Sequence, residues 1–142
     1  MLDSFTVTIS RDGPIVLVDD NPGDELIVRR SYERSKLDNP WIAFRSGPEF
    51  LTHLQEVRAG RQPMPGLVLL DINMPEMSGL DVLARVRDDP DFRELPVFCM
   101  LTSSTDPRDR QRAEARGASG FVVKPNDPAD YVAFFDALAR SG

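Results

Sequence analysis

Three aspartates of this chain each follow a short apolar run, and their chemistry suits phosphoryl transfer. Asp19 and Asp20 follow the run Ile15 to Val18, and Asp71 follows the run Leu67 to Leu70. Three carboxylates in one pocket repel one another unless a cation neutralises them, and Mg²⁺ accepts carboxylates while leaving room for phosphate oxygens. A carboxylate in such a pocket can itself be the nucleophile, because aspartyl phosphates are a known form of covalent catalysis.

A hydroxyl and an ammonium group follow two later apolar runs. Thr102 comes after one run and Lys124 after the next, and Ser103 is the alternative hydroxyl if the first run ends one residue later. The chain holds 15 arginines but only two lysines, the other being Lys36. A mobile ammonium point charge and a hydroxyl hydrogen bond both stabilise a phosphoryl group, so these residues complete a candidate phosphoryl site.

Apolar runs alternate with segments of helical period along the chain. The expected strands are Ile15 to Val18, Trp41 to Arg45, Leu67 to Leu70, Val97 to Leu101 and Gly120 to Val123. The expected helices are Asp24 to Lys36, Gly47 to Ala59, one capped by Ser78 and ending before Pro90, one from Asp106 to Gly117, and one capped by Asp127. This alternation predicts an α/β fold, a (βα)₅ chain whose parallel sheet is covered by helices on both faces.

The candidate residues all lie just after expected strands. In open α/β sheets the ligand crevice lies outside the carboxyl ends of the strands, so this edge is where chemistry is expected. If the strand order is 2-1-3-4-5, the first and third strands are neighbours. The carboxylates of Asp19, Asp20 and Asp71 then converge at the point where the strand order reverses.

Length, charge and cysteine content exclude several classes of protein. The chain has 142 residues, enough for one domain, which we expect over residues 13–142 after an N-terminal extension of residues 1–12. A net charge of −6 argues against nucleic-acid and membrane-surface partners. The single Cys99, the lack of a secretory signal and the shortness of the apolar runs predict a soluble cytoplasmic protein.

Four segments carry a resemblance to a known family. They are LVDDNPGD (17–24), LLDINMPEMSGLDVL (69–83), LTSS (101–104) and GFVVKP (120–125). In this order, each at the end of an expected strand, they resemble the receiver domain of two-component response regulators over roughly residues 13–140. The resemblance implies a flavodoxin-like three-layer fold with the strand order 2-1-3-4-5. The NPGD sequence is more particularly similar to stand-alone regulators partnered with phytochromes.

The resemblance implies a function for each acidic-pocket residue. Asp71 would accept a phosphoryl group from the phosphohistidine of a sensor histidine kinase. Asp20 would ligate Mg²⁺ directly, Asp19 would act through water, and Asn73 would offer its backbone carbonyl to the metal. Lys124 would pair with the phosphoryl group.

The resemblance also implies how the domain would switch. Thr102, with Ser103 as the alternative, would contact a phosphoryl oxygen after activation. Phe121 stands where the family has an aromatic side chain whose inward or outward orientation reports activation. The Lys124–Pro125 peptide bond resembles the family's cis peptide, which places the cis proline at Pro125.

The function that follows is a stand-alone phosphoacceptor switch and not an enzyme with a separate substrate. Its expected partners are a sensor histidine kinase, which the resemblance suggests is a bacteriophytochrome, and a second copy of the chain. The dimer would use the face of the fourth and fifth helices, where Phe134 and Phe135 lie. Three alternatives remain: a phosphorelay intermediate, a scaffold that is not phosphorylated, and a Mg²⁺-dependent aspartyl-phosphate phosphatase. The phosphatase is disfavoured because Asn73 stands where its second aspartate would be.

Overall fold

The fold is a five-stranded parallel sheet between two layers of helices. The computed structural model describes residues 8–103 and 105–141, and the sheet order is β3-β2-β4-β5-β6. The strands are β2 (Ile15–Val18), β3 (Trp41–Phe44), β4 (Leu67–Asp71), β5 (Phe98–Thr102) and β6 (Gly120–Val123). With the strands of this sheet numbered from its first, the order is 2-1-3-4-5, so the predicted flavodoxin-like (βα)₅ fold is confirmed.

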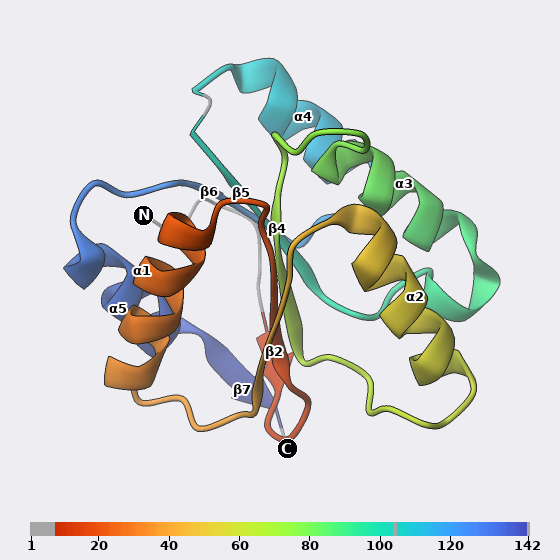
Figure 1. Ribbon diagram of the computed structural model, residues 1–142, viewed down its shortest axis with the longest axis horizontal. Coiled ribbons are helices and arrows are strands. Elements are labelled where there is room, and N and C mark those ends of the chain that lie inside the picture. The colour runs from red at the N-terminus through yellow and green to blue at the C-terminus, as the bar shows by residue number, and fades with distance from the viewer. Residues whose placement is uncertain (1–7, 104, 142) are drawn as a thin grey trace.

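The helices connect successive strands and cover both faces of the sheet. They are α1 (Pro22–Arg34), α2 (Gly47–Arg58), α3 (Gly79–Asp88), α4 (Pro107–Ala115) and α5 (Pro128–Ala137), with a short 3₁₀ turn at Pro90–Phe92. Figure 1 shows α1 and α5 on one side of the sheet and α2, α3 and α4 on the other. Each α-helix begins after a capping side chain that accepts a backbone N–H; these caps are Asn21, Ser46, Ser78, Asp106 and Asp127.

Successive strand residues pack into two separate cores. Val16 and Val18 of β2 belong to the core beneath α2 and α3, whereas Ile15 and Leu17 belong to the core beneath α1 and α5. The same alternation runs along β4, because the side chains of a strand point to opposite faces in turn. Both faces of the sheet are therefore covered, which explains why the strands read as continuous apolar runs and not as alternating ones.

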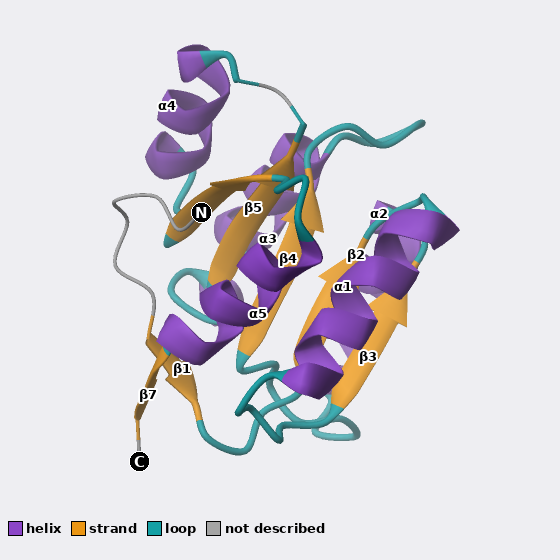
Figure 2. Ribbon diagram, turned by 90° about the vertical axis from the view of Figure 1, so that its left-hand side faces the viewer, coloured by secondary structure: helices purple, strands orange, loops and turns teal. Residues whose placement is uncertain are grey.

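A second, two-stranded sheet joins residues near the two ends of the chain. Strand β1 (Thr8–Ser10) pairs in parallel with β7 (Ala139–Ser141), which follows α5 (Figure 2). Ile9 is fully buried and packs in the core of α1 and α5. Part of the expected N-terminal extension thus forms a strand that packs on the domain, while residues 1–7 lie outside the described residues.

Ile9 tests whether β1 is an integral part of this domain. Replacing a fully buried isoleucine by alanine removes apolar contacts and leaves a cavity, so we expect Ile9→Ala to lower the free energy of unfolding by about 2–4 kcal/mol. Urea denaturation followed by circular dichroism measures the change. The neighbouring Thr8 is exposed, and Thr8→Ala should alter stability by less than about 0.5 kcal/mol. Equal, small effects of both substitutions would show that β1 does not pack in solution.

Candidate functional site

Asp19, Asp71 and Lys124 lie close together because their side chains point to the same face of the sheet. Each lies two residues beyond a strand residue that packs under α1 and α5. These strand residues are Leu17, Leu69 and Val122. Since strand side chains repeat their direction every second residue, the three functional groups leave the sheet on the side of α1. The fold therefore gathers them at the carboxyl edge of the sheet, as the sequence predicted.

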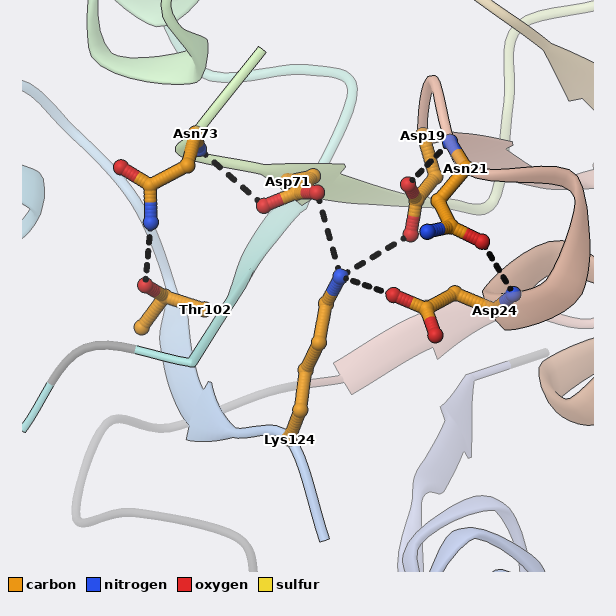
Figure 3. Close-up of polar contacts among 7 residues, drawn as sticks. All are labelled: Asp19, Asn21, Asp24, Asp71, Asn73, Thr102 and Lys124. Atoms are coloured by element: carbon orange, nitrogen blue, oxygen red, sulfur yellow. Dashed lines mark hydrogen bonds and ion pairs between the residues drawn. The ribbon is translucent and has the colours of Figure 1, made fainter.

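The ammonium group of Lys124 lies at the centre of three carboxylates. Its Nζ is 3.1 Å from Asp19 Oδ2, 3.1 Å from Asp71 Oδ2 and 2.8 Å from Asp24 Oδ2 (Figure 3). Asp19 and Asp71 are buried, so their negative charges are kept from bulk water. One cation shared among three anions is an incomplete neutralisation, and the pocket retains a negative charge that a further cation can offset.

Asp19, Asp20 and Asp71 form an acidic cluster that fits a divalent metal ion. Each offers a carboxylate oxygen, and these oxygens lie within 4.8 Å of one another. Backbone amides orient two of the groups: Asn21 N donates to Asp19 Oδ1 at 2.9 Å, and Asn73 N donates to Asp71 Oδ1 at 3.1 Å. Carboxylate oxygens are the hard donors that Mg²⁺ prefers, so this donor set fits the ion.

The pocket alters the ionisation of both Asp71 and Lys124. Burial, with the charge of Asp19 adding to it, raises the pKa of Asp71 to about 6, although the Lys124 ammonium opposes the rise. Burial alone would lower the pKa of Lys124, but the hydrogen bond to Asp24 and the charges of Asp71 and Asp19 raise it above its ordinary value. At neutral pH the pocket therefore holds an ionised lysine and a largely ionised Asp71.

The hydroxyl of Thr102 lies next to the acidic pocket but on the other face of the sheet. Thr102 is the last residue of β5 and is fully buried, and its Oγ1 accepts a hydrogen bond from Asn73 Nδ2 at 3.4 Å (Figure 3). Ser103 is exposed, so Thr102 is the hydroxyl that lies in the network. The aromatic ring of Phe121 is buried in the core under α2 and α3 and points inward in this structure.

The loop from β4 to α3 holds Asp71 by a close backbone approach. A Cβ on Gly79 would lie 2.1 Å from the carbonyl oxygen of Asp71, so only glycine allows α3 to begin there. Gly79 N also donates to Ile72 O at 2.9 Å. In the same loop Glu76 has a φ of 69°, which costs energy for a residue other than glycine. The conformation of the residues that follow Asp71 therefore fixes the position of its backbone.

The cis proline predicted at Pro125 is wrong. In the part of the chain that the structure describes, the one cis peptide bond is Leu95–Pro96, and Lys124–Pro125 is trans. The two isomers of an X–Pro bond differ by only about 0.5–1 kcal/mol, so tertiary contacts and not the sequence decide between them. Ser104, the last residue of the LTSS segment, lies outside the described residues.

Sequence reasoning missed Asp24, which makes the shortest contact to Lys124. The residue reads in the sequence as the start of a helix, and nothing in its spacing shows that its carboxylate turns towards the pocket. The position of Asp24 in the chain could have indicated this contact. Asp24 lies in the first turn of the helix that directly follows the acidic pair, and this helix covers their face of the sheet.

Comparison with known families identifies the chain. Residues 15–136 match the model of the response regulator receiver domain. The chain belongs to this family. Receiver domains are phosphoacceptor switches of two-component signalling and imply a histidine kinase as partner. Among the described residues of this receiver domain, no helix has the length and apolar character needed to cross a membrane.

Two curated relatives share about a third of their aligned residues with this receiver domain. The probable methanogenesis regulatory protein FilR2 of Methanothrix harundinacea is 31% identical over 125 residues, which cover 87% of this chain and 80% of the relative. Response regulator Rcp1 of Synechocystis is 33% identical over 93 residues, which cover 65% of this chain and 63% of Rcp1. The second match therefore spans slightly less than two thirds of its relative.

Solved structures of response regulators share the fold. The Mn²⁺-bound form of Rcp1 aligns with a TM-score of 0.74 and 27% identity, covering 87% of this chain and 89% of Rcp1. The bacteriophytochrome response regulator RtBRR aligns with a TM-score of 0.74 and 36% identity, covering 88% of this chain and 77% of that one. The Mn²⁺-bound relative shows that a regulator of this fold holds a divalent cation.

The raised pKa of Asp71 predicts a pH-dependent stability in the absence of divalent cations. The folded state binds the Asp71 proton more tightly than the unfolded chain, so this carboxyl destabilises the fold progressively as pH rises from about 4 to about 6. Asp71→Asn removes the effect. Urea unfolding should show the variant gaining stability over wild type between pH 4 and pH 7.

Glu33→Gln provides the control for this comparison, because it removes a carboxylate with a 61% exposed side chain outside the pocket. Its stability relative to wild type should stay nearly constant over the same pH range. A constant difference between Asp71→Asn and wild type would show that the Asp71 pKa is not raised.

Proposed function

We propose that this chain is a stand-alone response regulator in which Asp71 accepts a phosphoryl group from a sensor histidine kinase. The observation that carries the proposal is the arrangement of Asp71 in a receiver domain. Its carboxylate is buried at the end of β4, is held by a backbone amide, and shares the Lys124 ammonium with Asp19. This arrangement supplies a nucleophile and a cation beside it.

In the proposed reaction, a carboxylate oxygen of Asp71 attacks the phosphorus of the kinase phosphohistidine. The new P–O bond forms as the P–N bond breaks, and the imidazole leaves with the electron pair and takes a proton from water. Asp71 is largely ionised at neutral pH, so the nucleophile needs no general base. Lys124 then pairs with the phosphoryl oxygens, where its charge offsets the negative charge transferred to Asp71.

Asp19, Asp20 and Asp71 are the side chains that would hold Mg²⁺, with the backbone carbonyl of Asn73 beside them. Bound Mg²⁺ supplies positive charge to the phosphoryl oxygens. From the resemblance we propose that Asp20 contacts the metal directly and that Asp19, which is more buried, contacts it through water.

Phosphorylation would be transmitted through Thr102 and Phe121. The Thr102 hydroxyl lies at the end of β5, one strand from Asp71, and a phosphoryl oxygen would draw it towards the pocket. Phe121 lies beside Met100 on the neighbouring strand and in the same core as α3. Movement of Thr102 would change the space available to this ring and thereby the surface formed by α4, β6 and α5.

The proposed partner is a cytoplasmic sensor histidine kinase of the bacteriophytochrome type. Two similar structures support this choice through their descriptions: RtBRR is a bacteriophytochrome response regulator, and RPA3017 is described in red light signaling of R. palustris. A phosphorelay intermediate uses the same Asp71 chemistry and differs in its downstream partner. A phosphatase is not favoured, since the Asn73 side chain is an amide that donates to Thr102 and supplies no acid or base.

Incubation with Mg²⁺ and acetyl phosphate tests the phosphoacceptor function without the kinase. We expect one added phosphoryl group by intact mass, stable in acid and labile in base. The adduct should be absent from Asp71→Asn and should require the metal. An unmodified wild-type protein, or equal modification of Asp71→Asn, would contradict the proposed function and favour a scaffold.

We also propose a homodimer through the α4–β6–α5 face, supported by the resemblance to the family. The expected contribution of Phe134 and Phe135 is wrong, because both rings are buried in the core of α1 and α5. On this face Val123 of β6 is a large apolar side chain that is 37% exposed. Sedimentation velocity should show a dimer that Val123→Asp weakens. A monomer with and without phosphorylation would remove the proposal.

A further inference from the structure

Asp24 contacts the pocket lysine from outside the acidic cluster. It is the third residue of α1, and its backbone N–H donates to the capping Asn21 Oδ1 at 3.0 Å. Its Oδ2 accepts from Lys124 Nζ at 2.8 Å, a shorter contact than the 3.1 Å to Asp19 or to Asp71. Figure 3 shows Asp24 on the far side of the ammonium from Asn73.

The first turn of α1 gives this carboxylate a fixed place. Pro22 and the Asn21 cap restrict the start of the helix, and a negative side chain is favoured at a helix N-terminus. The side chain of Asp24 is 39% exposed, whereas those of Asp19 and Asp71 are 0% and 6% exposed. Lys124 therefore reaches from a buried pair of carboxylates to a third one at the mouth of the pocket.

We propose that Asp24 is a positioning residue that holds the Lys124 ammonium at the mouth of the pocket, leaving Asp19 and Asp71 accessible to a divalent cation. Asp24 lies outside the cluster of Asp19, Asp20 and Asp71 and acts through Lys124. The inference rests on the proposed phosphoacceptor function, to which it adds a residue that sets how readily the pocket accepts its metal.

The physical reason is competition for the same oxygens. An ammonium group has three N–H donors, and here three carboxylates receive them. Without Asp24 the ammonium pairs more fully with Asp19 and Asp71. It then competes more strongly for these carboxylates with the cation and with the water on that cation. The hydrogen bond that Lys124 donates to Asp24 is also the largest of the interactions that raise the pKa of Lys124, which agrees with its short distance.

Asp24→Asn tests the inference by a binding measurement on unphosphorylated protein. Because the Asp24–Lys124 pair is partly exposed, we expect the Mg²⁺ dissociation constant from isothermal titration calorimetry to rise by about two- to fivefold. Asp24→Glu keeps the charge and should restore most of the affinity. Glu25→Gln removes the adjacent charge, which pairs with Arg29, and should leave the constant within about twofold of wild type.

A double-mutant cycle with Lys124→Gln separates positioning from long-range charge. If Asp24 acts through Lys124, the effect of Asp24→Asn on Mg²⁺ affinity should largely disappear in the Lys124→Gln background. An effect of equal size in both backgrounds, or none in wild type, would overturn the inference. Thermal unfolding of each variant checks that it is folded.

Acetyl phosphate labelling of the wild type keeps the two proposals distinct. Wild-type protein that forms the adduct, with unchanged Mg²⁺ affinity in Asp24→Asn, would contradict the positioning residue alone. Wild-type protein that forms no adduct would contradict the phosphoacceptor function, whatever the cycle shows. If both the phosphoacceptor function and the positioning role of Asp24 hold, the Asp24→Asn variant should be phosphorylated more slowly than wild type at Mg²⁺ concentrations below the dissociation constant. The rate should fall by about the same factor as the Mg²⁺ affinity.

Discussion

The structure depends on one electrostatic constraint: the Lys124 ammonium is shared by three carboxylates at the edge of the sheet. Two of these carboxylates are buried, so without a nearby cation their ionisation would be strongly unfavourable. Breaking such a buried arrangement by removing the cation leaves charges that no solvent can screen. Lys124 provides this cation. It follows directly after β6, which lies two strands away from β4, and the parallel sheet brings the ends of these strands to the same edge.

Much of this arrangement could be predicted from the sequence because it follows from strand periodicity. Apolar runs of four or five residues fix the strands, and polar residues directly after them must lie at the carboxyl edge. The helix caps at Ser78, Asp106 and Asp127 could also be predicted, because short polar side chains before a helical segment accept hydrogen bonds from its first N–H groups. Asp19, Asp71 and Lys124 could thus be placed together before any coordinates.

Features that depend on the orientation of a helix on the sheet, or on contacts between residues far apart in the sequence, could not be predicted in this way. The sequence places Asp24 in a helix, but only the packing of α1 on the sheet turns its carboxylate towards Lys124. The strands β1 and β7 are three residues long and become recognisable only because they pair with each other. The isomer of the bond before Pro96 likewise reflects the surrounding fold.

The pairing of β1 with β7 has a consequence for the order of folding. Thr8 lies opposite Ala139, so this contact closes a loop that contains nearly the whole chain. The entropy cost of closing a loop grows with its length, and contacts of such high sequence separation form late unless others have shortened the effective loop. The five-stranded sheet, whose neighbouring strands are much nearer in sequence, provides that shortening. We therefore expect the terminal strand pair to dock onto a domain that is already assembled and to open first in local unfolding.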